Sequence, residues 1–251
     1  MPSLPLAGRR ALVTGASRGL GAATALALAG AGADVALLYR KKAGEAAMTA
    51  GRIEAMGVRC PVVPADVSDW ESCREAVDTA AGRLGGLDIV VANAGVANPF
   101  LPLADTPVDR WRKIMGVNLD GAFHTVKAAA PWLLRSAHGS VVFVSSVGGR
   151  RAAPMQGAYG TAKAALLALA RTWAAELAPA GVRVNTAVPG LFHTDMTETL
   201  RTAHEDGGDG LVPVGRVGEP SELADAIVFL CGPGAGYITG AELVVDGGMS
   251  A

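Results

Sequence analysis

Short apolar runs rich in β-branched residues alternate with longer Ala- and Leu-rich stretches along the whole chain. Strands that are each followed by a helix indicate βαβ units and a parallel sheet. Several runs, such as residues 141–144, are apolar at consecutive positions, which is typical of strands covered by helices on both faces. The pattern therefore predicts an α/β fold, with one domain over residues 1–251, a doubly wound seven-stranded parallel sheet and helices on both faces.

No internal repeat, low-complexity tract or linker interrupts this order. The expected strands are Arg10–Thr14, Asp34–Tyr39, Arg59–Pro64, Asp88–Ala92, Ser140–Ser145, Val182–Ala187 and Glu242–Val245. The expected helices are Leu20–Ala31, Ala43–Met56, Trp70–Leu84, Val108–Arg135, Tyr159–Leu177 and Ser221–Leu230.

Composition and charge exclude several classes of protein. Half of the 251 residues are hydrophobic and 18% are charged, which excludes a disordered chain. The 22 Lys and Arg residues balance 23 Asp and Glu residues, so no basic excess indicates nucleic acid or an anionic membrane as a partner. The uncharged stretches are too short for a membrane-spanning helix, and the first residues lack the pattern of a secretory signal.

Cysteine and histidine usage bears on the compartment and on metals. Cys60, Cys73 and Cys231 are odd in number and far apart, so we expect reduced, buried thiols in a cytoplasmic protein. The four histidines form no HxxxH pair and no Cys/His cluster, so no metal site is expected. His193 either faces the substrate or packs in a loop near the cofactor.

A glycine-rich segment follows the first expected strand. Residues 14–21 read TGASRGLG and lead directly into a helix. Glycines allow the backbone to approach a pyrophosphate, and the helix N-terminus supplies free N–H groups with a partial positive charge. The same residues match GxSxG, the nucleophile elbow of α/β-hydrolases. Only one strand precedes Ser17, whereas that elbow needs several, so we predict a dinucleotide site rather than a hydrolase.

The end of the second strand bears on which dinucleotide binds. An acidic residue there would hold the ribose 2′-hydroxyl of NAD. Asp34 opens the strand and is at the wrong end, whereas Arg40 occupies the expected place. Arg40 and Arg18 suit a 2′-phosphate because guanidinium donors form a planar fork, so we predict NADP(H). The alternative, a solvated basic start to the second helix, would explain residues 41–42 but explains Arg18 less easily. Asp66 is expected to accept from the adenine amino group.

Two pairs of residues carry candidate acid/base chemistry. Tyr159 and Lys163 are four positions apart in a helical pattern, so they share one face. A nearby cation favours the phenolate and would lower the pKa of Tyr159 from its usual value near 10. Ser145 and Ser146 end the fifth strand, where one hydroxyl could donate to a carbonyl oxygen. Taken alone, a Tyr and a Lys at this spacing are more often ordinary helix-surface residues.

Together these motifs resemble the short-chain dehydrogenase/reductase family, over essentially the whole chain. The resemblance implies a single-domain doubly wound Rossmann fold and an oxidoreductase acting on CH–OH or C=O groups with NADP(H). The matching residues are TGASRGLG at 14–21, Asp66, ANAG at 92–95, Asn118, Ser146, YGTAK at 159–163, Pro189, Gly190 and Thr194.

The resemblance also implies a role for each matching residue. Tyr159 would be the general acid in reduction, and Lys163 would bind the nicotinamide ribose and lower the pKa of Tyr159. Ser146 would orient the substrate carbonyl, and Asn118 would hold a water that relays protons to Lys163. The expected cofactor contacts are Gly15, Ser17, Arg18, Gly19, Leu20, Gly21, Tyr39, Arg40, Asp66, Val67, Asn93, Ala94, Gly95, Tyr159, Lys163, Pro189, Gly190 and Thr194.

Within the family the chain is most similar to 3-oxoacyl-(acyl-carrier-protein) reductases, which implies reduction of a 3-oxoacyl thioester or a related β-keto compound. Basic residues that such enzymes often carry are replaced here by Ala137 and Ala180, although Arg135 and Arg183 are near. The alternatives are a free ketone, a sugar or a cyclic alcohol as substrate, or a non-catalytic NADP-binding sensor. The complete set of four catalytic residues argues against the sensor.

Two further expectations concern assembly and motion. The helix that carries Tyr159 is apolar on nearly every side, so it should be buried on nearly every side. In the family this helix pairs across a two-fold axis, and the resemblance implies a homotetramer, with a dimer as the alternative. The polar segment Thr197–Gly210 is expected at the carboxyl edge of the sheet, either as a mobile lid or as an ordinary surface loop.

Overall fold

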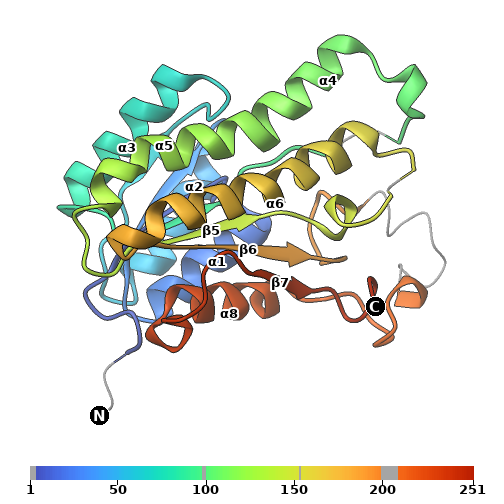
Figure 1. The fold of residues 1–251 in the computed structure, drawn as a ribbon. Helices are drawn as coiled ribbons and strands as arrows, with labels where there is room; N and C mark the ends of the chain where they lie inside the picture. The colour runs from blue at the N-terminus through green and yellow to red at the C-terminus, as the bar shows by residue number, and fades with distance from the viewer. Residues whose placement is uncertain (1–3, 98–99, 153, 199–208) are drawn as a thin grey trace.

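One parallel sheet organises the molecule. The computed structural model describes residues 4–97, 100–152, 154–198 and 209–251. The sheet has seven strands in the order β3-β2-β1-β4-β5-β6-β7, all parallel (Figure 1), which confirms the predicted sheet. The strands are β1 Arg10–Thr14, β2 Asp34–Tyr39, β3 Val62–Pro64, β4 Ile89–Ala92, β5 Ser140–Val144, β6 Arg183–Pro189 and β7 Glu242–Val245.

Two strand boundaries differ from the expectation by more than one residue. β3 begins at Val62 rather than Arg59, because the preceding Pro61 has no N–H to donate to the ladder. The carbonyls of Arg59 and Pro61 still accept from β2, at 2.9 Å each. β6 continues to Pro189, where it pairs with Val245 of β7. That extension carries the Pro189-Gly190 turn out to the carboxyl edge.

The expected helix over residues 108–135 is helical from Val108 to Leu133, but a π-helical turn divides it. The chain there forms α4, a π-helical turn at Gly116–Asp120 and then α5. The break coincides with Asn118, whose side-chain amide bonds to two backbone carbonyls instead of facing solvent. The helices are α1 Gly19–Gly30, α2 Ala43–Glu54, α3 Trp70–Leu84, α4 Val108–Met115, α5 Gly121–Leu133, α6 Gly157–Leu177 and α8 Pro220–Cys231.

Helices cover both faces of the sheet, as expected (Figure 1). α1, α2 and α8 lie on one face, where buried Leu28, Ile53 and Ile227 belong to one core cluster. α3, α5 and α6 lie on the other face, where Val77 and Leu166 belong to a second cluster. Among the described residues, no helix is both long and apolar enough to cross a bilayer.

The strand order places a crevice at the centre of the sheet. β1 pairs with β2 on one side and with β4 on the other, so the chain changes direction between β1 and β4. Loops that leave two such strands diverge to opposite faces, and ligands bind in the gap at their carboxyl ends. The glycine-rich segment follows β1, and residues 93–97 follow β4, so both border this gap.

Candidate active site

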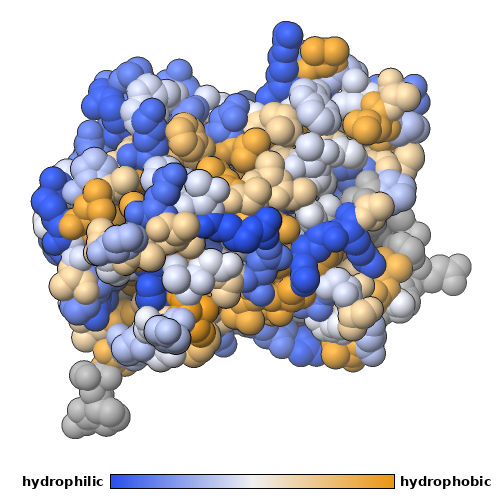
Figure 2. Space-filling view, viewed as in Figure 1, coloured by the Kyte–Doolittle hydropathy of each residue, from blue (hydrophilic) through white to orange (hydrophobic). Residues whose placement is uncertain are grey.

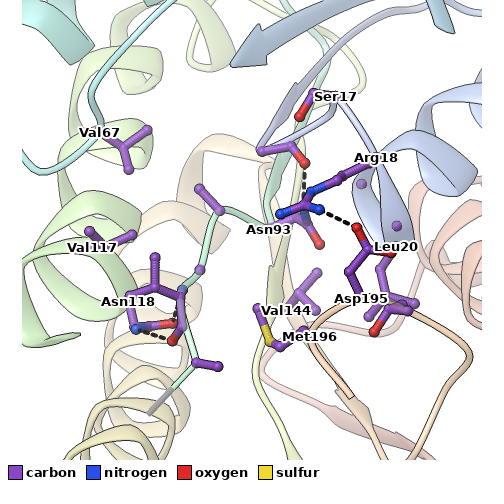
Figure 3. A pocket seen from close by; sticks show the side chains of 18 of the residues that line it. Ser17, Arg18, Leu20, Val67, Asn93, Val117, Asn118, Val144, Asp195 and Met196 are labelled. Atoms are coloured by element: carbon purple, nitrogen blue, oxygen red, sulfur yellow. Dashed lines mark hydrogen bonds and ion pairs between the residues drawn. The ribbon is translucent and has the colours of Figure 1, made fainter. Parts of the chain in front are cut away.

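A pocket of about 460 Å³ opens at the carboxyl edge of the sheet (Figure 3). Its wall contains every residue that the sequence proposed for catalysis or cofactor binding. These residues come from the carboxyl ends of β1 to β6, from the first two turns of α1 and α6, and, for Asn118, from the π-helical turn between α4 and α5. They are Gly15, Ser17, Arg18, Gly19, Leu20, Gly21, Tyr39, Arg40, Asp66, Val67, Asn93, Ala94, Gly95, Asn118, Ser146, Tyr159, Lys163, Pro189, Gly190 and Thr194.

Thr14 and Asn93 lock the glycine-rich segment to the loop after β4. The Thr14 hydroxyl accepts from the backbone N–H groups of Asn93 and Ala94, each at 3.0 Å. In return, Asn93 Nδ2 donates to the Thr14 carbonyl at 2.9 Å. A Cβ on Gly21 would collide with the Gly15 carbonyl and with the Asn93 amide. Glycine is therefore required at residue 21 by close packing of backbone on backbone.

The N-terminus of α1 fits a dinucleotide pyrophosphate. α1 begins at Gly19, and its N-cap residue, Arg18, makes no side-chain cap bond. The first turn carries no acidic side chain. The free N–H groups and the partial positive charge of the helix are thus not neutralised from within the helix. An anion that enters the pocket meets them directly.

We predict that Gly21→Ala weakens NADPH binding and destabilises the fold by about 1–3 kcal/mol, because the added methyl forces apart two tightly packed loops. Fluorescence titration and denaturant unfolding measure the two effects. The control is Gly30→Ala at the other end of α1, where an added Cβ meets nothing within 4 Å. That variant should be as stable as the wild type or up to about 1 kcal/mol more stable. Equal behaviour of the two variants would refute the close-packing argument.

The cations near the end of β2 are paired with carboxylates in this structure. Arg40 donates to Asp66 at 3.3 Å, and Lys42 lies 3.2 Å from Glu45. Burial alone would raise the pKa of Asp66, but hydrogen bonds from Ser68 and the charge of Arg40 outweigh it and lower that pKa. Asp66 is therefore a carboxylate at neutral pH and an acceptor in the pocket wall.

Tyr159, Ser146 and Lys163 converge at the inner end of the pocket. Burial raises the pKa of Tyr159, and a hydrogen bond with Ser146 opposes this only in part. The lowering expected from Lys163 is wrong for this arrangement, because the Lys163 ammonium lies 5.7 Å from the Tyr159 ring centroid and donates to the Val144 carbonyl at 2.8 Å. Tyr159 is therefore a neutral phenol at pH 7, the form that can donate a proton.

Lys163 is buried, with 4% of its surface exposed. Burial lowers the pKa of its ammonium to about 8. Ser145 lies beside it and donates its hydroxyl to the Lys163 backbone carbonyl at 2.7 Å. Of the two serines considered from the sequence, Ser145 thus supports α6, and Ser146 is the one that reaches Tyr159.

We predict that the free energy of unfolding of the wild type rises relative to Lys163→Met between pH 8 and pH 10.5, by an amount on the order of 3 kcal/mol. Over that range the unfolded chain holds a proton on Lys163 that the folded chain has lost, so stability increases with pH. Urea unfolding at a series of pH values measures the difference. Lys113→Met, on the exposed side of α4, should show no such trend. A difference independent of pH would contradict the lowered pKa.

Asn118 fastens the loop after β4 to the break between α4 and α5. Its Nδ2 donates to the carbonyls of Val96 and Ile114, at 3.1 and 3.0 Å, and its Oδ1 accepts from the Val96 N–H at 3.3 Å. Figure 3 shows Asn118 on the opposite side of the pocket from Arg18. The side chain therefore positions the loop that borders the cofactor site. No contact of the described residues tests the expected water relay.

Several residues lie elsewhere than the sequence suggested, or were missed by it. His193 lies 3.6 Å from Glu219, and it is not part of the pocket wall. Of the expected lid Thr197–Gly210, residues 199–208 lie outside the described part of the chain. Asp195 and Met196 line the pocket although they were not among the expected cofactor contacts, and Thr197, the first residue of the expected lid, lines it too. The signal for Asp195 was its position directly after Thr194.

Comparison with known proteins identifies the family. A family model described as enoyl-(acyl carrier protein) reductase matches residues 15–250. The chain is 39% identical over 247 residues to an L-rhamnose 1-dehydrogenase (NAD(P)(+)) of a Sphingomonas species, with 97% of each chain covered. The chain belongs to the short-chain dehydrogenase/reductase family. It is accordingly an oxidoreductase that acts on CH–OH or C=O groups.

Other members of the family carry different names over the same fold. A 3-oxoacyl-[acyl-carrier-protein] reductase of a Synechocystis species is 38% identical over 240 residues, covering 95% of this chain and 96% of that one. A short-chain dehydrogenase of Burkholderia cenocepacia, crystallised in complex with NADP, superposes with a TM-score of 0.92 at 37% identity, covering 98% of this chain and 100% of that one. The family is thus established, whereas the names of its members span several substrates.

Proposed function

We propose that this protein is an NADP(H)-dependent ketone reductase whose substrate is a 3-oxoacyl thioester or a related β-keto compound. The observation that carries the proposal is the convergence of Ser146, Tyr159 and Lys163 in the same pocket as an uncapped helix N-terminus and the cations of Arg18 and Arg40. A proton donor, a carbonyl-orienting hydroxyl and a dinucleotide cradle are the parts that carbonyl reduction needs.

Side chains of this protein would donate the proton and orient the substrate carbonyl. When bound, a nicotinamide cofactor supplies the hydride to the carbonyl carbon. The Ser146 hydroxyl orients the carbonyl oxygen, and Tyr159 donates its phenolic proton to that oxygen, so the product is a secondary alcohol. Lys163 lies one helical turn from Tyr159, where its ammonium would bind the nicotinamide ribose. Asn118 holds the neighbouring loop in place.

The cofactor assignment rests on charge at the end of β2. Tyr39 is followed there by Arg40, where an NAD-binding enzyme would place a carboxylate. The B. cenocepacia relative was crystallised with NADP at 37% identity, which supports the same choice here. The remaining cofactor contacts would come from the wall residues named above, with Thr194 and the backbone after Pro189 holding the carboxamide.

We predict that Arg40→Ala weakens NADPH binding about 10-fold and changes NADH binding by less than about 2-fold, because only NADPH carries the phosphate that the guanidinium binds. Competition titrations with both cofactors measure the effect. Arg52→Ala, an exposed cation in the last turn of α2 outside the pocket wall, is the matched control and should change neither. Equal losses for NADPH and NADH would overturn the cofactor assignment.

The main alternative substrate is a sugar or another free ketone. Relatives named L-rhamnose 1-dehydrogenase and sorbose reductase, at 39% and 37% identity, favour it. Of the two arginines near the positions where an acidic carrier protein would bind, Arg183 is not available for such a contact. Arg183 turns inward and donates to the Leu230 carbonyl at 2.7 Å, and Arg135 stacks on Trp132 with its guanidinium 4.6 Å from the ring centroid. We therefore propose thioester recognition without a strong carrier-protein contact through Arg183.

Turnover of a substrate panel tests the proposal. NADPH oxidation is followed with an acetoacetyl thioester, a free β-keto ester and an enoyl thioester, and NADP⁺ reduction is followed with L-rhamnose and sorbitol. Reduction of the β-keto compounds supports the proposed substrate class. Activity confined to L-rhamnose or sorbitol would replace it with a sugar or polyol dehydrogenase. Cofactor binding without turnover on any member would revive the non-catalytic sensor.

We further propose that residues 1–251 form one cofactor-binding and catalytic domain that assembles as a cytoplasmic homotetramer. α6 exposes small side chains, including Ala164 and Ala168, and Phe123 of α5 is also exposed. Apolar residues lie among hydrophilic ones on the face shown in Figure 2. Phe229 and Tyr237 are exposed near α8 and β7, which would be the second interface.

The three cysteines are free and buried, which fits a reducing compartment. Light scattering should give the mass of four chains.

A further inference from the structure

Arg18 and Asp195 meet across the mouth of the pocket. Arg18 lies in the glycine-rich segment between β1 and α1, and Asp195 follows β6, 177 positions later in the chain. The Arg18 guanidinium donates to the Asp195 carboxylate, and both residues line the pocket. Figure 3 shows the two side chains pointing toward each other. The ion pair therefore joins two cofactor-binding segments that are not adjacent in sequence.

A second carboxylate approaches the same guanidinium from another side. Glu45, in the first turn of α2, lies 3.9 Å from Nε of Arg18, whereas Asp195 contacts the terminal nitrogen Nη1. Glu45 also pairs with Lys42 at 3.2 Å. Carboxylates thus occupy two edges of the Arg18 fork. The single positive charge of Arg18 is already neutralised by groups of the protein itself.

An arginine fork that is held by a carboxylate is less available to a phosphate. Carboxylate and phosphate oxygens bind the same planar set of N–H donors, so they compete for one guanidinium. The 2′-phosphate of NADPH would bind Arg18, and this contact would require the Asp195 pair to be given up or weakened. NADH has no such phosphate and leaves the pair intact. The penalty for breaking the pair therefore falls on NADPH alone.

We propose that Asp195 is a specificity-determining residue, which competes with the 2′-phosphate for Arg18 and so narrows the preference for NADPH over NADH. The inference rests on the proposed function, since it takes Arg18 as a ligand of the 2′-phosphate. Asp195 acts through Arg18 and is a positioning residue rather than a catalytic one. The side chains of Arg18 and Asp195 are 52% and 71% exposed, so the effect is that of a solvent-accessible ion pair.

The test measures dissociation constants for NADPH and NADH at one low ionic strength. Asp195→Asn removes the competing charge, and it should tighten NADPH binding about 2- to 5-fold while leaving NADH unchanged. Asp195→Asn should also tighten the binding of 2′,5′-ADP by the same factor and leave that of 5′-AMP unchanged. These two nucleotides carry no nicotinamide. Glu75→Gln is the matched control, because it removes the same charge from a 70% exposed side chain on α3 outside the pocket wall.

Arg18→Gln separates this inference from the cofactor assignment. Arg18→Gln should lower the ratio of the NADH to the NADPH dissociation constant. Adding Asp195→Asn to Arg18→Gln should not change that ratio further. If Arg18→Gln lowers the NADPH preference but Asp195→Asn leaves it unchanged, the competition is wrong and the cofactor assignment stands. If Arg18→Gln leaves the ratio unchanged, both fail. Equal weakening of NADPH and NADH by Asp195→Asn would also overturn the competition, since the pair would then close over either cofactor.

Discussion

Replacing Tyr159 with Phe should reduce kcat for the ketone substrate about 100- to 10,000-fold and leave NADPH binding within about 2-fold of the wild type. The substitution removes one oxygen atom and keeps the ring that lines the pocket. Burial raises the pKa of this phenol, so the wild-type side chain is protonated through neutral pH and ready to donate. Phe has no proton to give, and the loss should appear in kcat rather than in cofactor affinity.

The chain provides a matched control for this substitution. Tyr237 is fully exposed near β7, so Tyr237→Phe removes the same atom from a site outside the pocket wall and should leave kcat unchanged. NADPH oxidation gives kcat, and fluorescence titration gives the dissociation constant. Loss of NADPH binding together with activity in Tyr159→Phe would contradict the role of proton donor, because the residue would then be needed to hold the cofactor.

Replacing Asp88 with Ala should lower the free energy of unfolding by about 3–5 kcal/mol. Asp88 is 4% exposed and immediately precedes β4. It accepts from Nε and Nη2 of Arg10 at 2.8 Å each, from the Arg10 backbone N–H at 2.9 Å and from the Ser136 hydroxyl at 2.6 Å. These bonds tie the start of β1 to the start of β4 and to the end of α5. The variant leaves Arg10 partly buried without its partner.

Acid unfolding provides a second readout for Asp88. Burial alone would raise the pKa of this carboxyl, but hydrogen bonds from Arg10 and Ser136 outweigh burial and hold the pKa below its usual value. The group therefore stabilises the fold above the unfolded pKa near 3.9, and this contribution is lost as the pH falls through the lower folded pKa.

Urea unfolding at pH 7 and pH 3 measures both parts of the prediction. The difference between wild type and Asp88→Ala should shrink at pH 3. Glu75→Ala, an exposed carboxylate that faces Arg74 at 3.6 Å, should change stability by less than about 0.5 kcal/mol. A similarly small effect of Asp88→Ala at pH 7 would show that the buried ion pair contributes little.

Local patterns were sufficient to predict the sheet and the glycine-rich wall of the pocket. β1, β2 and β7 begin and end at the expected residues, because short β-branched runs flanked by turn residues specify a strand with little help from distant contacts. The TGASRGLG motif predicted the turn before α1 for a similar reason, since its glycines act through the adjacent backbone. Most of the expected pocket residues lie at the carboxyl ends of strands or in the helical turns beside them, whereas Asn118 comes from the π-helical turn between α4 and α5.

Long-range contacts explain what local patterns could not predict. The helical pattern of residues 108–135 runs through Asn118 without interruption, and the π-helical turn there coincides with hydrogen bonds from the Asn118 amide to Val96 in the loop after β4. The boundary of β3 differs for a local reason. Pro61 has no N–H to donate, so β3 begins after it, at Val62 rather than at the expected Arg59.

The sequence by itself determined the order of strands and helices, the place of the glycine turn and the identity of the groups that can donate protons or bind phosphate. The tertiary structure alone decided the ionisation of those groups and their partners. Burial raises the pKa of Tyr159, and Arg18 meets Asp195 only because β1 and β6 end at the same edge of the sheet. The physical reason is that backbone preferences act between neighbours in sequence, whereas desolvation and ion pairing depend on neighbours in space.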